Sequence, residues 1–175
     1  MKNFKYTDKE MKQLISSIVI LIDTRDKNIE HITNWFDKHK IRWKSKKLDY
    51  ADYSFMIPAN KELDIPRDMY FDKEIAIERK GSLEELSGNI SNGRDRFEKE
   101  LALAPHYKVL LIENGSYSDI VSGNYQTQLN KSSYIGTLHK FWFKYNIPFV
   151  FMPNKKYTPM FIYKTFEYYI KTFIF

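Results

Sequence analysis

Short apolar runs alternate with segments of helical spacing along most of the chain. An apolar run bounded by polar residues is typical of a buried strand, and apolar residues every three or four positions are typical of a helix. Strands are therefore expected over residues 15–23, 41–48, 52–57, 74–80, 108–113 and 148–152. Helices are expected over residues 28–40, from Ser82, from Arg94, and over residues 116–122, 132–145 and 158–173. This alternation predicts an α/β fold, with a central mixed sheet and helices on both faces.

Two segments need separate comment. Residues 58–73 lengthen the connection between two expected strands and are expected to form a loop. The C-terminal helix carries an apolar stripe at helical spacing, made of Ile162, Phe166, Ile170 and Phe173. Closing the core and self-association are both compatible with such a stripe.

One expected strand, Ile75-Ala-Ile-Glu-Arg-Lys80, ends in three charged residues. Side chains alternate along a strand, so Glu78 and Lys80 share one face and Arg79 points to the other. A carboxylate holds a hard divalent cation, and a neighbouring lysine can orient the attacking water or stabilise developing negative charge. Asp52, at the start of the preceding strand, would complete such a site. The alternative is a solvated strand edge with an ion pair.

Further motifs accompany this strand and favour the metal site over the solvated strand edge. An apolar run over residues 18–22 leads into Asp23-Thr-Arg25-Asp26, which is typical of a buried strand delivering charged groups at its end. The triplet Ala51-Asp52-Tyr53 follows, and Gly93-Arg94 comes after Glu-Arg-Lys. Several motifs in one order are more specific than any one of them.

Together these motifs resemble the nuclease domain of the XPF family. Its pattern runs from an apolar strand into Asp-x-Arg-Glu, then Gly-Asp-Tyr, then Glu-Arg-Lys closely followed by an acid, then a Gly-Arg helix. The resemblance covers roughly residues 17–115 and is strongest to the small standalone versions of bacteria and their phages. It implies a restriction-endonuclease-like fold of the PD-(D/E)XK superfamily and a divalent-metal-dependent DNA endonuclease.

The chain departs from this pattern at four places, one of which is the lengthened segment 58–73 described above. Asp26 stands where the family usually has Glu, and Ala51 replaces Gly. An extra residue follows Lys80, so that Glu84 and Glu85 compete for the acid position. None of these changes removes a catalytic group.

The resemblance assigns catalysis to Asp23, Asp52, Glu78 and Lys80. Asp52 and Glu78 are expected to bind Mg²⁺ or Mn²⁺, with Asp23 as a direct or water-mediated ligand. Lys80 is expected to position the attacking water or stabilise the transition state.

Five residues are expected to support these groups. Asp26, together with Glu84 or Glu85, would orient waters and Lys80. Arg25 would brace the carboxylates, touch phosphate or form a structural ion pair. Arg79 is expected to pack, to brace acids or to contact the DNA backbone.

Arg94 and Arg96 lie at the start of an expected helix, close to Asn92. Guanidinium charge and helix N-terminal amides together suit phosphate, so these three residues are candidate DNA contacts. The alternative is a solvated helix start.

The composition fits a single domain over residues 1–175, with core motifs in 17–115 and a C-terminal helical part in 116–175. The chain has no cysteine, which excludes disulfides and cysteine zinc sites and suits a reducing compartment. The apolar run at residues 14–22 is too short to span a membrane, so a cytoplasmic protein without a membrane partner is expected. A formal charge of +6 is compatible with a polyanionic partner.

The resemblance implies cleavage of branched DNA, such as flaps, forks or junctions, in repair or recombination. Family members usually add a helix-hairpin-helix domain, and none is expected here. A homodimer or a partner protein is expected to replace it. The competing hypothesis is a catalytically silent DNA-binding or scaffold subunit, against which the retained Asp23, Asp52, Glu78 and Lys80 argue.

Overall fold

The computed structural model describes residues 6–174, which build one mixed sheet. Its spatial order is β2-β1-β3-β5-β6-β7, with the short β4 paired to β3. The strands β1/β2, β5/β6 and β6/β7 pair in parallel, whereas β3 runs antiparallel to β1, β4 and β5. The strands are β1 (Val19–Ile22), β2 (Arg42–Ser45), β3 (Tyr53–Ile57), β4 (Met69–Tyr70), β5 (Ile75–Lys80), β6 (Tyr107–Glu113) and β7 (Phe149–Met152).

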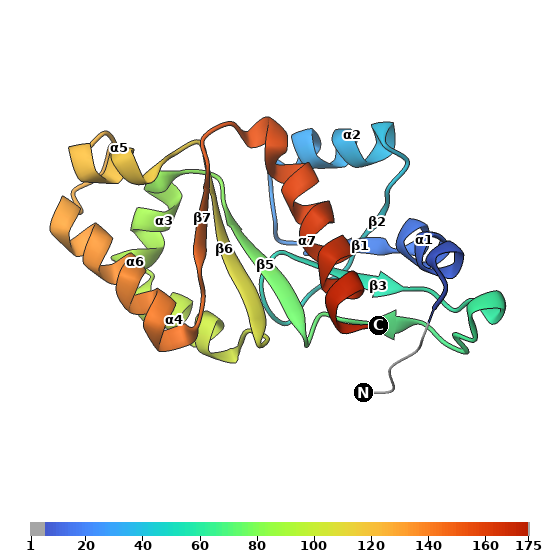
Figure 1. The fold of residues 1–175 in the computed structure, drawn as a ribbon. Helices are drawn as coiled ribbons and strands as arrows, with labels where there is room; N and C mark the ends of the chain where they lie inside the picture. The colour runs from blue at the N-terminus through green and yellow to red at the C-terminus, as the bar shows by residue number, and fades with distance from the viewer. Residues whose placement is uncertain (1–5, 175) are drawn as a thin grey trace.

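Helices cover both faces of this sheet, in two groups that Figure 1 shows at opposite ends of the molecule. The first group is α1 (Asp8–Ser17), α2 (Glu30–Lys38) and α7 (Thr158–Phe173). The second group is α3 (Leu83–Ile90), α4 (Arg94–Leu103), α5 (Tyr117–Ser122) and α6 (Lys131–Tyr145). The predicted α/β class, with a central mixed sheet between helices, is confirmed.

The alternation of side chains along β5 and β6 separates two cores. Ile75 and Ile77 join the core beneath α1, α2 and α7, as does Leu111. Leu110 and Ile112 point the other way, into the core beneath α3, α4 and α6. Every charged residue at the ends of β5 and β6 therefore belongs to one helical group or the other.

The C-terminal helix closes the first core. Ile162, Phe166 and Ile170 of its apolar stripe are fully buried, and the Phe166 ring lies 5.2 Å from that of Phe55 on β3. The stripe is thus a core face. In residues 6–174 no helix is both long and apolar enough to cross a membrane.

Two expected element boundaries were wrong. Residues 15–17 end helix α1 instead of opening a strand, because Thr7 and Glu10 form a capping box that starts a helix at Asp8. The expected loop over 58–73 contains a 3₁₀ helix, Lys61–Leu63, and strand β4. Strand β4 forms because its two residues pair with the end of β3.

The turn between β6 and α5 tests how tightly the second core is packed. A Cβ added at Gly115 would lie 2.6 Å from Cγ of Leu83, the first residue of α3. We expect Gly115→Ala to lower the free energy of unfolding by about 1–3 kcal/mol, because the buried Leu83 must shift.

Gly136 in α6 is the matched control, since an added Cβ there meets nothing within 4 Å. Gly136→Ala should raise the free energy of unfolding by about 0.5–1 kcal/mol through helix propensity. Urea unfolding followed by circular dichroism measures both values. Equal effects of the two substitutions would contradict the packing at Gly115.

Candidate active site

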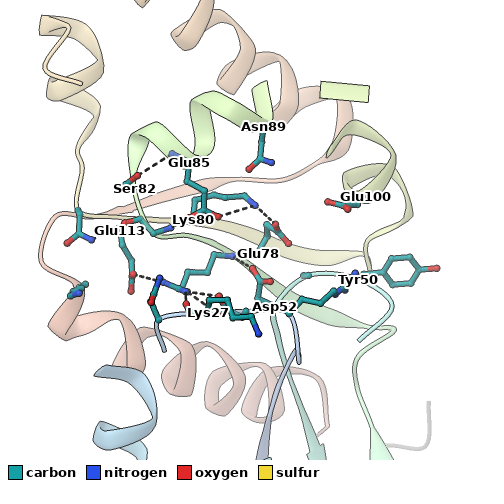
Figure 2. Close-up of a pocket in the computed structure, with 18 of the residues that line it drawn as sticks. Lys27, Tyr50, Asp52, Glu78, Lys80, Ser82, Glu85, Asn89, Glu100 and Glu113 are labelled. Atoms are coloured by element: carbon teal, nitrogen blue, oxygen red, sulfur yellow. Dashed lines mark hydrogen bonds and ion pairs between the residues drawn. The ribbon is translucent and has the colours of Figure 1, made fainter. Parts of the chain in front are cut away.

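A cavity of about 680 Å³ opens where β1, β5 and β6 end and β3 begins. Figure 2 shows its side chains converging from the two helical groups. One wall comes from α3 and α4 and carries Glu85, Asn89, Arg96 and Glu100. The opposite wall comes from α2, the turn after β1 and the 3₁₀ helix Lys155–Tyr157, and carries Asp26, Lys27, Asn28, His31 and Lys155.

Glu78 and Lys80 lie on the α3–α4 side of β5. The Lys80 Nζ is 2.8 Å from Oε1 of Glu78, and the two side chains are only 9% and 13% exposed. The ammonium also lies 4.9 Å from the centre of the Phe97 ring of α4. The strand period thus brings this pair together on one face, as predicted.

Asp52 is fixed by main-chain hydrogen bonds from both sides. Its N–H donates to the carbonyl of Ile77 at 3.0 Å, and its own carbonyl accepts from the N–H of Asp23 at 2.8 Å. Its Oδ2 accepts the N–H of Arg79 at 2.8 Å. Within the described chain Oδ1 has no hydrogen-bond donor, which leaves this atom available to a ligand.

Ala51 shows why glycine is usual before this acid. Its φ is +57°, in the left-handed region. An alanine there costs roughly 1–2 kcal/mol that glycine does not. The chain nevertheless keeps the turn that delivers Asp52 to the strand.

Burial makes the charges of these three groups interdependent. It raises the pKa of Asp52 well above its ordinary value, and the nearby Glu78 adds to the shift. Burial also raises the pKa of Glu78, although the Lys80 ammonium opposes this. For Lys80 burial alone would lower the pKa, but Glu78 and Asp52 outweigh it and raise the pKa. The lysine therefore stays cationic.

The donor set fits a hard divalent cation. Burial raises the pKa of both Asp52 and Glu78, the negative charge of Glu78 adds to the shift at Asp52, and a cation would relieve this cost. In residues 6–174 no three Asp, Glu, His or Cys side chains come together as a metal cluster. Mg²⁺ is commonly held by one or two carboxylates and keeps several waters, so two acids suffice.

Asp23 is a correction to the predicted ligand set. Its side chain is fully buried outside the cavity lining. Its Oδ2 accepts the N–H of Leu48 at 2.6 Å, and its Oδ1 accepts both the N–H and Nε of Arg25 at 2.8 and 2.7 Å. These bonds make Asp23 a structural anchor of the turn after β1, and Arg25 its ion-pair partner.

On the α2 side of β5, Arg79 forms a buried network. Its guanidinium contacts Asp26 at 2.6 Å and Glu113 at 2.7 Å, and Tyr53 donates its hydroxyl to Asp26 at 2.5 Å. The other oxygen of Glu113 is 2.8 Å from Nε2 of His31. Arg79 therefore braces acids, one of the three roles considered for it.

The network corrects the role expected for Asp26. Burial would lower the pKa of Arg79, but the contacts with Asp26 outweigh it and raise the pKa. Because both Asp26 oxygens are bonded to Arg79, this acid holds Arg79 and does not orient Lys80.

Geometry separates the two competing acids at the start of α3. Glu85 lines the cavity, where its Oε2 accepts the N–H of Gly81 at 2.8 Å and its Oε1 lies 3.8 Å from Nζ of Lys80. Glu84 accepts instead from the N–H of Gln126, outside the cavity. Of the two acids, Glu85 is therefore the one that lies beside Lys80 in the cavity.

Of the three candidate DNA contacts, only Arg96 lines the cavity. Arg96 lines the cavity and pairs with Glu100 at 3.0 Å. Arg94 pairs with Glu98 at 2.7 Å and lies over the Phe141 ring, away from the cavity. Asn92 does not line the cavity either.

Sequence reasoning missed several residues of the cavity. Asn89 and Glu100 lie one helical turn beyond Glu85 and Arg96, and the i, i+4 spacing was a usable signal. The buried Oδ1 of Asn89 has no partner in the described chain. Glu113 ends the strand parallel to β5, so its proximity follows from the pairing of Lys80 with Ile112.

The comparisons with known proteins agree with this architecture. Two solved structures share the fold, which is restriction-endonuclease-like: XPF from Aeropyrum pernix (14% identity, TM-score 0.63) and XPF from Aeropyrum pernix in complex with DNA (16%, 0.62). They cover 86% and 87% of this chain, which spans 61% and 65% of theirs. No curated protein sequence matches.

A family model described as the ERCC4 domain matches residues 22–165. The chain therefore belongs to the ERCC4 domain family, and the predicted resemblance to XPF nuclease domains is confirmed. The chain spans less than two thirds of the two Aeropyrum proteins.

The pKa shifts of two aspartates predict opposite effects on stability. The folded pKa of Asp52 is raised, so metal-free stability falls as pH rises from about 4 through that pKa. We expect Asp52→Asn to be about 1–3 kcal/mol more stable than wild type at pH 7.5 in EDTA, since Asn still accepts from Arg79. The difference should shrink to near zero at pH 4.

Asp23→Asn is the control with the reverse sign. Burial alone would raise the pKa of Asp23, but hydrogen bonds from Arg25 and Leu48 lower it. Its stabilisation is present above about pH 4 and is lost as pH falls through the lowered pKa. Asp23→Asn should therefore be less stable at pH 7.5, and urea titrations at both pH values decide. The same sign for both variants would contradict this assignment.

Proposed function

We propose that this chain is a divalent-metal-dependent DNA endonuclease. The observation that carries the proposal is that Asp52, Glu78 and Lys80 line one cavity at the ends of adjacent strands, in a chain of the ERCC4 domain family. Two carboxylates and an ammonium at the floor of an open cavity suit phosphodiester hydrolysis.

Asp52 and Glu78 would hold Mg²⁺ or Mn²⁺. Such a cation supplies Lewis-acid stabilisation of phosphate charge and makes water a better nucleophile. The chain's own contribution is to hold Asp52 in place through Arg79 and Ile77, and Glu78 through its ion pair with Lys80. Preorganised charge of this kind costs no reorganisation when the reaction occurs.

Lys80 stabilises negative charge. Its raised pKa keeps it protonated, so it serves as a cation facing the phosphate and not as the base that deprotonates water. Glu78 and Glu85 position its ammonium from two sides. Arg96, across the cavity, would contact the DNA backbone.

The preferred substrate in this proposal is branched DNA, in repair or recombination. One similar structure is described as XPF in complex with DNA, which supports a DNA partner. The net charge of +6 favours association with a polyanion.

The chain is also proposed to form a homodimer. An apolar patch on α5 and α6, defined here as Tyr117, Val121, Trp142 and Phe143, is exposed, with Phe143 82% accessible. It continues over β7, an edge strand, where the Trp142 and Phe149 rings lie 5.3 Å apart. Contiguous apolar surface of this kind marks an interface, and a second copy of the same patch is self-complementary.

Cleavage of labelled fork, flap, junction, duplex and single-stranded DNA tests the activity. We expect cutting with Mg²⁺ or Mn²⁺ and none with EDTA. Asp52→Ala and Glu78→Ala should each abolish cutting, and Lys80→Ala should slow it roughly 10²–10³-fold, since a transition-state charge is lost.

Glu85→Gln and Glu84→Gln are the matched pair. The first should slow cleavage about tenfold, because Lys80 loses a positioning partner, and the second should not. Residual cutting by a folded Asp52/Glu78 double variant would end the proposal. Binding without cutting under every metal would favour the silent DNA-binding or scaffold subunit.

Sedimentation analysis tests the homodimer. We expect wild type to be dimeric and Phe143→Lys to be monomeric, because a charge would be buried in an apolar interface. Tyr168→Lys, at a 59% exposed residue of α7, is the control and should stay dimeric. A monomeric wild type would refute the dimer and leave the nuclease proposal intact.

A further inference from the structure

Six cationic side chains line the cavity, and four of them form ion pairs with acidic side chains of the protein. Their partners lie within 3.0 Å: Arg25 with Asp23, Arg79 with Asp26 and Glu113, Lys80 with Glu78, and Arg96 with Glu100. Within residues 6–174 the other two, Lys27 and Lys155, form no ion pair. Among the described residues that line the cavity, they are the lysines and arginines without an acidic partner.

Both lysines belong to the wall opposite Arg96. Lys27 lies in the turn after β1, where its carbonyl accepts Nη2 of Arg79 at 2.6 Å. Lys155 opens the 3₁₀ helix Lys155–Tyr157, whose start is capped by the side chain of Asn154. Both side chains are exposed, on backbone that hydrogen bonds hold in place.

Neither Glu113 nor Asp26 forms an ion pair with either lysine. Glu113 faces the same wall, but its Oε1 is 2.8 Å from His31 and its Oε2 is 2.7 Å from Arg79. Asp26 is likewise bonded to Arg79. An external anion is therefore the natural partner for the two lysines, and compact ammonium groups suit phosphate.

We propose that Lys27 and Lys155 bind the backbone phosphates flanking the one that faces Asp52, Glu78 and Lys80. This inference rests on the proposed nuclease function. The DNA strand would cross the sheet end, from Arg96 on the α4 wall to the two lysines on the α2 wall. The lysines would set the path of the strand and leave the chemistry to the buried acids.

Binding of a labelled fork in EDTA, at a series of KCl concentrations, tests the subsite. Lys27→Ala/Lys155→Ala should weaken binding roughly tenfold or more at 0.1 M salt. It should also reduce the magnitude of the slope of log affinity against log salt concentration by about 1 to 2. Each phosphate contact that is lost lowers the number of counterions released when the protein binds. In Mg²⁺, KM should rise and kcat should change little.

Lys9→Ala/Lys12→Ala is the matched control. Both residues are exposed on α1, outside the cavity lining, and the substitution removes the same charge. This control should keep the wild-type slope. Equal losses in the two double variants would mean that only overall charge matters, and would overturn the subsite.

Methylphosphonate substitution locates the contact. Each phosphate around the cut is neutralised singly, and affinity is measured for wild type and for Lys27→Ala/Lys155→Ala. We expect at least one flanking position to weaken wild-type binding and to become silent in the variant. If no position distinguishes the proteins, the subsite is refuted. If wild type itself neither binds nor cuts DNA, the nuclease proposal fails with it.

Discussion

The candidate site depends on the hydrogen bonds and ion pairs of one buried residue, Arg79. Its main-chain N–H holds Asp52 on one face of β5, and its side chain holds Asp26 and Glu113 on the other. The loop before β3, the turn after β1 and the end of β6 are thereby joined at one residue. Removing one partner of a buried ion pair typically costs 3–5 kcal/mol, so these segments keep their places together. Arg79, which has no part in the proposed chemistry, thus helps to determine the position of Asp52.

The sheet end divides the cavity into two electrostatic halves. Toward α3 and α4, carboxylates outnumber cations, and burial raises the pKa of Asp52 and Glu78. Toward α2, Glu113 is paired with Arg79 and His31, and Lys27 and Lys155 have no acidic partner among the described residues. A divalent cation suits the first half and a phosphate suits the second. A polyanionic strand laid across both halves would meet positive charge on either side of the buried acids.

Local periodicity predicted much of this arrangement, and long-range hydrogen bonds decided the rest. The period of two placed Glu78 and Lys80 opposite Arg79, because strand geometry allows no other assignment. The fate of Asp23 depended on the N–H of Leu48, 25 residues away, and no local pattern reports such a contact. The ion pair of Asp26 with Arg79 also joins residues far apart in the sequence, so no local pattern predicts it. The helix at Asp8–Ser17, by contrast, had a readable signal in Thr7 and Glu10.

The left-handed Ala51 has a consequence for how Asp52 is presented. Glycine at this position would relieve the strain, but it would also let the backbone visit many more conformations. Alanine restricts the turn to fewer of them, with Asp52 tied to Ile77 and Arg79. The chain gives up some folding free energy and gains a carboxylate whose approach is fixed before any ligand arrives. The methyl group of Ala51 therefore adds to the rigidity that these hydrogen bonds give to Asp52.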